Sequence, residues 1–218
     1  SERLPAAYLT NEACLGDYRF YVDARVIVPR SFIAELIPEQ FQPWIADPWS
    51  VTEVLELCTG SGCLAIMLAD AFPHAKIDAV DLSHEALEVA RRNVDDYQLQ
   101  ERVSLYESDL YIQLPTKKYD LIVSNPPYVN TTSMGKLPAE YRHEPRLALA
   151  GGDDGMDIVR TIIEQAPAHL SEEGLLVIEI GHERAFFEAA FPELEPIWLD
   201  TAEASDQILL LSRGQLLS

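Results

Sequence analysis

Cysteine is scarce in this sequence, and it contains no long hydrophobic run. Three of the 218 residues are cysteine, an odd number, and their spacing fits no zinc site. The five histidines show no paired-ligand pattern either, so we expect no metal site. No apolar run approaches the roughly 18 residues of a membrane span, and the first residues do not resemble a secretion signal. We therefore expect a cytoplasmic protein without a membrane partner.

Positive charge is also in short supply. The sequence has 16 lysines and arginines against 36 aspartates and glutamates, a formal net charge of −20. Proteins that bind nucleic acid neutralise phosphates, so a chain this acidic is poorly suited to a nucleic-acid substrate. An acidic surface attracts a basic partner instead. From composition alone, a charge that merely keeps the protein in solution is an equally good interpretation.

Residues 51–218 alternate between predicted strands and predicted helices. We expect strands at 51–57, 76–81, 102–106, 119–124, 175–180, 197–199 and 208–211, and helices at 63–72, 85–97, 156–170 and 182–191. Strands separated by helices of about 10–15 residues indicate a doubly wound, mainly parallel sheet with helices on both faces. The fold class is therefore α/β, with one main domain at 51–218.

Residues 1–50 are expected to form an appended segment. Residues 19–23 and 25–28 read as two short strands of a β-hairpin that turns near Ala24. Ser31 can cap a helix that ends at Pro38, and residues 38–50 are expected to connect it to the main domain.

The segment Asn125-Pro126-Pro127-Tyr128 follows the predicted strand at 119–124. Proline lacks an N–H and stiffens the residue before it, so the strand must end here on a rigid segment. The Asn125 side chain and the Pro126 carbonyl both accept hydrogen bonds, which suits a planar NH₂ group with two donors. Tyr128 offers a flat face to such a group. An ordinary strand-ending turn is the structural alternative.

A second motif lies where the strand at 51–57 turns into the following helix. Glu56 precedes the segment Thr59-Gly60-Ser61-Gly62, in which glycine backbone can approach a ligand closely. Asp81 and Asp109 stand at or just after the ends of the next two strands, where carboxylates can bind ribose hydroxyls and an adenine amino group. As structural residues, these two aspartates would only cap helices or turns.

The spacing of Gly60, Gly62 and Ala65 also satisfies the loose nicotinamide-binding fingerprint. Two features favour S-adenosylmethionine over nicotinamide. Glu56 can meet the ammonium group of a cofactor that carries an amino acid, and hydride transfer has no evident use for Asn125-Pro126-Pro127-Tyr128.

These residues resemble the protein-glutamine N-methyltransferases, class I S-adenosylmethionine-dependent enzymes that act on release factors and on a large-subunit ribosomal protein. The closer resemblance is to the ribosomal, PrmB-type branch. It is carried by residues 28–37, 57–63, 137–145 and 147–155 and extends over nearly the whole chain from Tyr8. The family normally also has a helical N-terminal domain that helps to dock the substrate, and no such segment is present in this sequence.

The resemblance implies a cofactor site and a substrate site. The cofactor, with S-adenosylhomocysteine as its product, would be bound by Glu56, Cys58, Thr59, Gly60, Gly62, Asp81, Leu82, Asp109, Leu110 and Asn125. The substrate glutamine would be bound by Asn125, Pro126, Pro127, Tyr128 and Glu144, with Asn125, Pro126 and Tyr128 as the catalytic residues. Leu110 stands where the release-factor branch often has an aromatic residue. Glu144 could instead be a buried structural carboxylate paired with Arg142 or Arg146.

The implied activity is methylation of a glutamine amide in a basic ribosomal protein. The same two acceptors would also fit the amine of adenine or guanine, and a release factor is the nearest alternative substrate within the family. A cofactor-binding assembly factor without turnover is a further alternative. No His, Lys or Cys accompanies the tetrapeptide, so we expect positioning rather than a strong general base to favour the reaction.

Overall fold

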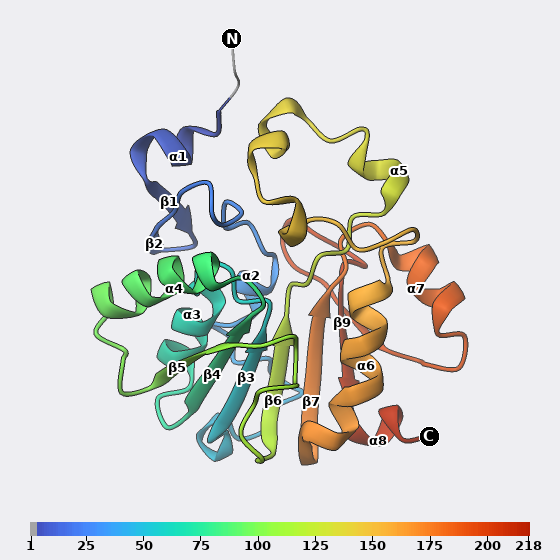
Figure 1. The fold of residues 1–218 in the computed structure, drawn as a ribbon. Coiled ribbons are helices and arrows are strands. Elements are labelled where there is room, and N and C mark those ends of the chain that lie inside the picture. The colour runs from blue at the N-terminus through green and yellow to red at the C-terminus, as the bar shows by residue number, and fades with distance from the viewer. Residues whose placement is uncertain (1–3) are drawn as a thin grey trace.

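A seven-stranded sheet forms the centre of the computed structural model, which describes residues 4–218 (Figure 1). Its strand order is β5-β4-β3-β6-β7-β9-β8. The strands are β3 (Glu53–Leu57), β4 (Lys76–Asp81), β5 (Val103–Glu107), β6 (Tyr119–Ser124), β7 (Leu170–Glu179), β8 (Ile197–Leu199) and β9 (Ile208–Ser212). Strands β3 to β7 are parallel, and β9 runs antiparallel to β7 and β8. The predicted doubly wound, mainly parallel sheet is confirmed.

Helices cover both faces of the sheet, because alternate side chains of the central strands feed two separate cores. Val54, Leu121 and Val123 pack with α2 (Ile33–Leu36), α3 (Cys63–Ala71) and the end of α4 (His84–Asp96). Leu55 and Ile122 face the other way and pack with α6 (Asp157–His169) and α7 (Arg184–Ala190). Central strands buried on both faces explain the near-continuous apolar runs in the sequence.

The predicted N-terminal hairpin exists, but its position was wrong. Its strands are β1 (Glu12–Leu15) and β2 (Tyr18–Tyr21), joined at Gly16, which has a φ of +56°. Residues 25–28 form no strand, because the Asp23 carboxylate accepts hydrogen bonds from Arg25 N and Nε and turns the chain instead. The sequence analysis also missed three short helices, α1 (Ala6–Thr10), α5 (Thr131–Met134) and α8 (Arg213–Leu216).

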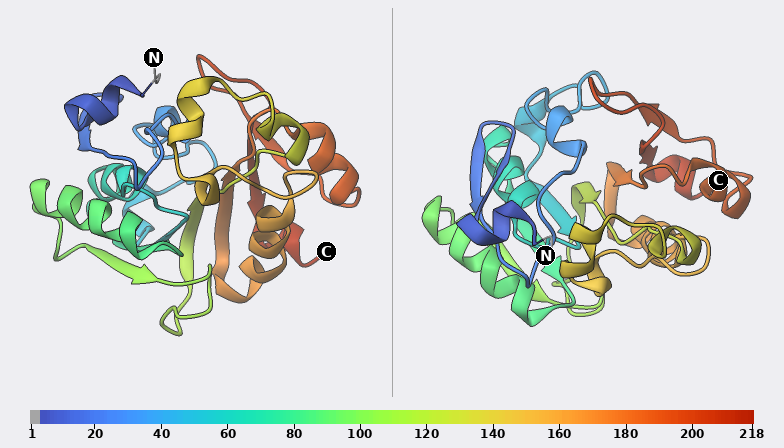
Figure 2. Two further views of the ribbon diagram at one scale, coloured as in Figure 1. Left: turned by 45° about the horizontal axis from the view of Figure 1, so that its top comes forward. Right: turned by 90° about the horizontal axis from the view of Figure 1, so that it is seen from above.

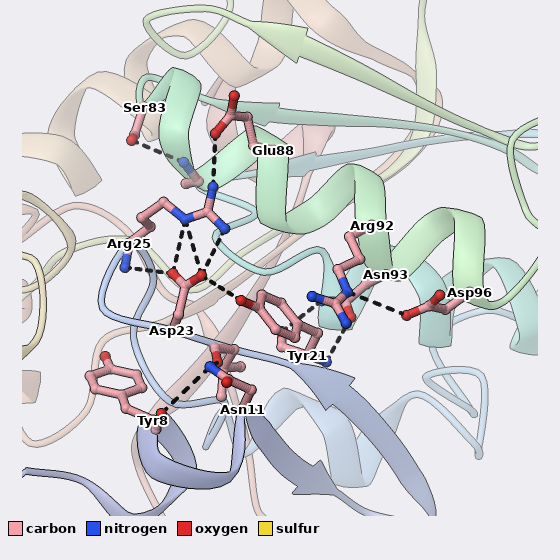
Figure 3. Close-up of polar contacts among 12 residues, drawn as sticks. Tyr8, Asn11, Tyr21, Asp23, Arg25, Ser83, Glu88, Arg92, Asn93 and Asp96 are labelled. Carbon is pink, nitrogen blue, oxygen red and sulfur yellow. Dashed lines mark hydrogen bonds and ion pairs between the residues drawn. The ribbon is translucent and has the colours of Figure 1, made fainter.

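Polar contacts attach the N-terminal segment to α4 (Figure 3). The buried Asn93 side chain accepts a hydrogen bond from Tyr21 N at 2.7 Å and donates to Tyr21 O at 3.0 Å. The Arg92 guanidinium lies 3.6 Å from the centre of the Tyr21 ring, and Arg25 bonds to Glu88 at 2.8 Å. The segment is thus held against the main sheet domain.

Two segments lie over the C-terminal ends of the parallel strands (Figures 1 and 2). One is the N-terminal segment, and the other is the stretch 129–155, which includes α5 and the 3₁₀ helices Ala139–His143 and Arg146–Ala148. They place side chains from distant parts of the sequence above the same sheet edge. Within residues 4–218, no helix is long and apolar enough to span a membrane.

Candidate functional site

Glu56 lies at the end of β3, directly before the glycine turn. Its side chain is buried and accepts a hydrogen bond from the Thr59 hydroxyl. Burial, with a smaller contribution from the negative charge of Asp81, raises the pKa of Glu56 to about 8. Gly62, with a φ of +78°, begins α3, and a Cβ there would lie 3.2 Å from Ala90 Cβ. This glycine therefore lets α3 pack closely against α4.

Asp81 ends β4 and orders two turns around it. Its carboxylate accepts hydrogen bonds from Gly60 N at 2.8 Å and Ser83 N at 2.9 Å. Ser83 in turn caps α4 by accepting a bond from Ala86 N. Burial raises the pKa of Asp81. The structural role considered for Asp81 is therefore present, and the same carboxylate also faces a cavity.

This first cavity gathers most of the predicted cofactor residues. It is lined by Glu56, Cys58, Thr59, Gly60, Asp81, Leu82, Asp109, Leu110 and Asn125. Gly62 is not among its lining residues and serves as the start of α3. Asp109 is exposed and Leu110 is buried, and Ser108 fixes their turn by donating a 2.9 Å hydrogen bond to Leu110 O. Residues from the ends of four neighbouring parallel strands, β3, β4, β5 and β6, thus meet in one pocket, as expected for parallel strands.

The tetrapeptide contributes to the walls of this cavity and of a second one. Asn125 and Pro127 line the first cavity, whereas Asn125, Pro126 and Tyr128 line the second. Asn125 therefore contributes to both. The second cavity is also bounded by the β1–β2 turn, by the start of α2, and by Glu179, His182 and Glu183.

The glycine-rich stretch 149–155 packs against the backbone at the end of the tetrapeptide. Val129 N donates to Leu149 O at 2.9 Å, and Gly151 N donates to Val129 O at 3.0 Å. A Cβ at Gly151 would lie 2.7 Å from Tyr128 Cα, and one at Gly155 would lie 2.2 Å from Tyr128 O. Only glycine permits backbone to approach backbone this closely.

Glu144 does not pair with Arg142 or Arg146, so that prediction was wrong. Its buried carboxylate accepts two hydrogen bonds from Arg30, at 2.8 and 2.6 Å, and the Arg30 guanidinium lies 4.4 Å from the Tyr141 ring centre. This fork-to-fork geometry is the strongest that arginine and a carboxylate form. The pair joins the N-terminal segment to the stretch 137–150, which both contribute to the walls of the two cavities.

Glu179 is a site residue that was not predicted from the sequence. This buried carboxylate ends β7, lines the second cavity and accepts a hydrogen bond from the Tyr128 hydroxyl at 3.3 Å. Its signal was available, because Asp81 was selected on the same grounds, as a carboxylate at the C-terminal end of a predicted strand. Among residues 4–218, no group of three or more His, Cys, Asp or Glu side chains could hold a metal ion.

Comparison with known families identifies a methyltransferase sequence. Residues 40–139 match the family model described as the methyltransferase small domain. The chain is 65% identical to the ribosomal protein uL3 glutamine methyltransferase of Bordetella pertussis, over 99% of this chain and 72% of that protein. It is 57% identical to the protein of the same name in Burkholderia pseudomallei, over 99% of this chain and 73% of that protein.

Solved structures share the fold at much lower identity. A methyltransferase from Pyrococcus furiosus has a TM-score of 0.62 and 16% identity, covering 92% of this chain and 91% of that chain. The hMettl16 catalytic domain in complex with an RNA hairpin has a TM-score of 0.64 and 14% identity, covering 89% and 76%. At these identities the likeness concerns the fold alone, and it is the class I methyltransferase fold expected from the sequence.

Proposed function

Because this chain belongs to the ribosomal protein uL3 glutamine methyltransferase family, we propose that it transfers a methyl group from S-adenosylmethionine to a glutamine side-chain amide of uL3. The domain at 51–218 carries the chemistry, and residues between 14 and 38 contribute to the walls of both cavities. The observation that carries this proposal is the position of Asn125, which lines the first cavity and the second one.

The first cavity suits the cofactor chemically. Glu56 is a buried carboxylate that forms no ion pair within residues 4–218, so a ligand ammonium group would compensate its charge. Asp81 would accept hydrogen bonds from ribose hydroxyls, and Asp109 with Leu110 would bind the adenine. The bound cofactor supplies a methyl group activated on a sulfonium sulfur.

The glutamine amide would reach the methyl group from the second cavity. Asn125 Oδ1 and the Pro126 carbonyl would accept its two N–H hydrogens, while Tyr128 lies against its plane. An amide nitrogen is a weak nucleophile because its lone pair is delocalised. Two acceptors fix the direction of that nitrogen and favour the positive charge that develops on it during transfer.

Positioning is the main source of rate in this proposal. Holding two reactants in line can lower a barrier by about 7–11 kcal/mol. No strong general base is required, because the methylated nitrogen becomes acidic once it carries positive charge, and the surplus proton then leaves to water. Glu144 acts indirectly, since its carboxylate is already bound by Arg30.

The charge of the molecule favours a basic segment of the substrate. The net charge is −20, and Asp17, Glu35, Glu179, Glu183 and Glu203 line the second cavity. The guanidinium on the same wall, that of Arg30, is paired with Glu144. We propose that a cationic stretch of the ribosomal protein lies near these carboxylates, and that nucleic acid is not the substrate.

The test is methyl transfer from labelled S-adenosylmethionine to three substrates in parallel: uL3, a peptide-chain release factor and bulk RNA. The expected result is label on uL3. Label on the release factor alone would mean that the chain is a glutamine methyltransferase whose substrate is the release factor and not uL3. Label on RNA alone would mean that Asn125 and Pro126 bind a base amine. No transfer to any of them, with the cofactor bound, would leave a cofactor-binding assembly factor.

A further inference from the structure

Glu179 is a carboxylate in an unusual position, buried at the C-terminal end of β7. Only 2% of the residue is exposed, yet it lines the second cavity together with Asn125 and Tyr128. Within residues 4–218 it forms no ion pair with lysine or arginine, and Arg30, which lines the same cavity, is bound to Glu144. Burial raises the pKa of Glu179.

Hydrogen-bond donors, rather than a cation, stabilise this carboxylate. Oε2 accepts from Ser31 Oγ at 2.6 Å and from Phe32 N at 2.9 Å, and Oε1 accepts from the Tyr128 hydroxyl at 3.3 Å. Both oxygens are therefore used. An ionised carboxylate is purely an acceptor, whereas a protonated one has fewer free lone pairs. The observed arrangement is the one that an ionised Glu179 satisfies best.

These donors come from two segments that line the cavities, namely the start of α2 and the tetrapeptide. Ser31 lines both cavities, and Tyr128 ends the tetrapeptide, whose residues line both as well. The Tyr128 ring also packs on Gly181, two residues beyond Glu179, where a Cβ would lie 2.6 Å from Tyr128 Cε2. One carboxylate thus joins β7, the start of α2 and the tetrapeptide.

We propose that Glu179 is a positioning residue for methyl transfer, which holds the Tyr128 ring and the Ser31 wall in the geometry that receives the glutamine side chain. This inference rests on the proposed function. Glu179 acts through Tyr128 and Ser31 and is not assigned a contact with the transferred methyl group. Glu179 itself lines the second cavity and not the first, so its loss should affect turnover of the protein substrate more than cofactor binding.

A second buried carboxylate–tyrosine pair provides a matched control. Asp78 accepts a hydrogen bond from the Tyr119 hydroxyl at 2.8 Å and also pairs with Lys117. Neither Asp78 nor Tyr119 lines either cavity. Breaking this pair removes the same kind of buried contact without touching the cavity walls.

The experiment measures kcat and KM for uL3, cofactor Kd and thermal stability in Glu179→Gln, Tyr128→Phe and the double variant. Gln keeps the shape and one acceptor oxygen. We expect Glu179→Gln to lower kcat about tenfold or more with cofactor Kd within about twofold. In the Tyr128→Phe background the same substitution should have a clearly smaller effect, because the contact is already gone. Asp78→Asn and Tyr119→Phe should lower stability with kcat within about twofold.

Three results would overturn the proposal. The first is a wild-type kcat in Glu179→Gln. The second is a double variant whose loss of kcat is the product of the losses in Glu179→Gln and Tyr128→Phe. The third is an equal loss of kcat in the Asp78 and Tyr119 controls. If Glu179→Gln does not fold, Ser31→Ala decides, because it removes one donor and an unchanged kcat would refute the role. Wild-type protein that methylates no glutamine would refute the proposed function itself, and with it the role of Glu179.

Discussion

At the scale of single residues, Asn125 has the most direct chemical role that the structure supports. It is the member of the tetrapeptide that lines both cavities. Its amide oxygen is a hydrogen-bond acceptor on a segment that Pro126 and Pro127 stiffen. An acceptor fixed in this way loses little freedom when a substrate binds, which is the condition for catalysis by positioning.

Replacing Asn125 by Ala should lower kcat for uL3 methylation by about two orders of magnitude or more, as expected for loss of a preorganised polar group at a reacting centre. Cofactor Kd should change little, because the other residues of the first cavity remain. Steady-state kinetics and calorimetric cofactor titration measure the two quantities. Asn125→Asp, which keeps an acceptor oxygen, should retain more activity than Asn125→Ala. Wild-type-like turnover in Asn125→Ala would contradict the role.

Glu56 should make cofactor binding depend on pH. Its pKa of about 8 means that it is mostly protonated at pH 7 in the free protein, while an ammonium group favours the ionised form. Binding should therefore release a proton, and affinity should rise with pH up to about 8 and level off above it. The ligand's own amino group titrates nearby, so Glu56→Gln serves as the reference.

The measurement for Glu56 is cofactor Kd between pH 6 and 9, together with calorimetry in two buffers of different ionisation enthalpy. The wild-type protein should release more protons per cofactor than Glu56→Gln at pH 7. Equal proton release in the two proteins would mean that Glu56 does not change its ionisation on binding.

Much of the site could be predicted from residue types and strand ends. The C-terminal ends of parallel strands lie at one edge of the sheet, so carboxylates at these ends are brought close together. The hydrogen-bond partners of these carboxylates were harder to predict. Arg30 and Glu144 are 114 residues apart, and Ser31 and Glu179 are 148 apart. Local spacing favoured Arg142 or Arg146 for Glu144 because helical and turn neighbours are visible in sequence, whereas contacts between distant segments are set by the folded chain.

At the scale of elements, the contact between the stretch 149–155 and the tetrapeptide depends on glycine. Gly155 has a φ of +82°, and a Cβ there would come within 2.2 Å of Tyr128 O. The backbone of the glycine-rich stretch therefore determines where Tyr128 lies.

Gly155→Ala should displace the Tyr128 carbonyl and lower kcat for uL3 about tenfold or more, besides a conformational cost of roughly 1–2 kcal/mol for a side chain at positive φ. Kinetics and denaturant unfolding separate the two effects. Gly214→Ala is the matched control and should leave kcat unchanged, because Gly214 is exposed in α8 and a Cβ there would have its nearest contact, with Ser212 Oγ, at 3.8 Å. Equal kcat in Gly155→Ala and wild type would show that the stretch does not position Tyr128.

The elements themselves were predicted best where burial alone decides them. The strands at 76–81, 119–124 and 197–199 have the expected limits. In each case a short apolar run is bounded by turn residues, which marks both ends of the strand. The hairpin was displaced because 25–28 is also rich in β-branched residues. There the hydrogen bonds of Asp23 to Arg25 turn the chain, and the apolar side chains of Val26 and Tyr8 pack together in a small core.

At the scale of the whole molecule, Asn93 joins three parts of the chain. Its side-chain nitrogen donates to Ser61 O at 2.8 Å and to Tyr21 O, and its oxygen accepts from Tyr21 N. The N-terminal segment, α4 and the turn at Ser61 are therefore linked by one buried amide. Figure 3 shows its contact with Tyr21.

Asn93→Ala should lower the free energy of unfolding by about 2–4 kcal/mol, because one buried and two part-buried backbone groups lose their partner at about 1 kcal/mol or more each. Cofactor affinity should also fall, since Ser61 O belongs to the turn of the first cavity. Urea unfolding and cofactor titration measure these effects. Arg92→Ala, which removes the more exposed contact to the Tyr21 ring, should cost about 1 kcal/mol or less. If both variants behave alike, the buried amide is not the main link.

In the proposed reaction the methyl group goes to a glutamine amide of uL3, and Asn125 is the acceptor that directs it. The most direct measurement is fragment mass spectrometry of uL3 after incubation with the protein and S-adenosylmethionine. We expect one methyl group on a glutamine side-chain nitrogen with the wild-type protein and none with Asn125→Ala. A methyl group on any other atom of uL3, or an equal yield from Asn125→Ala, would contradict the account.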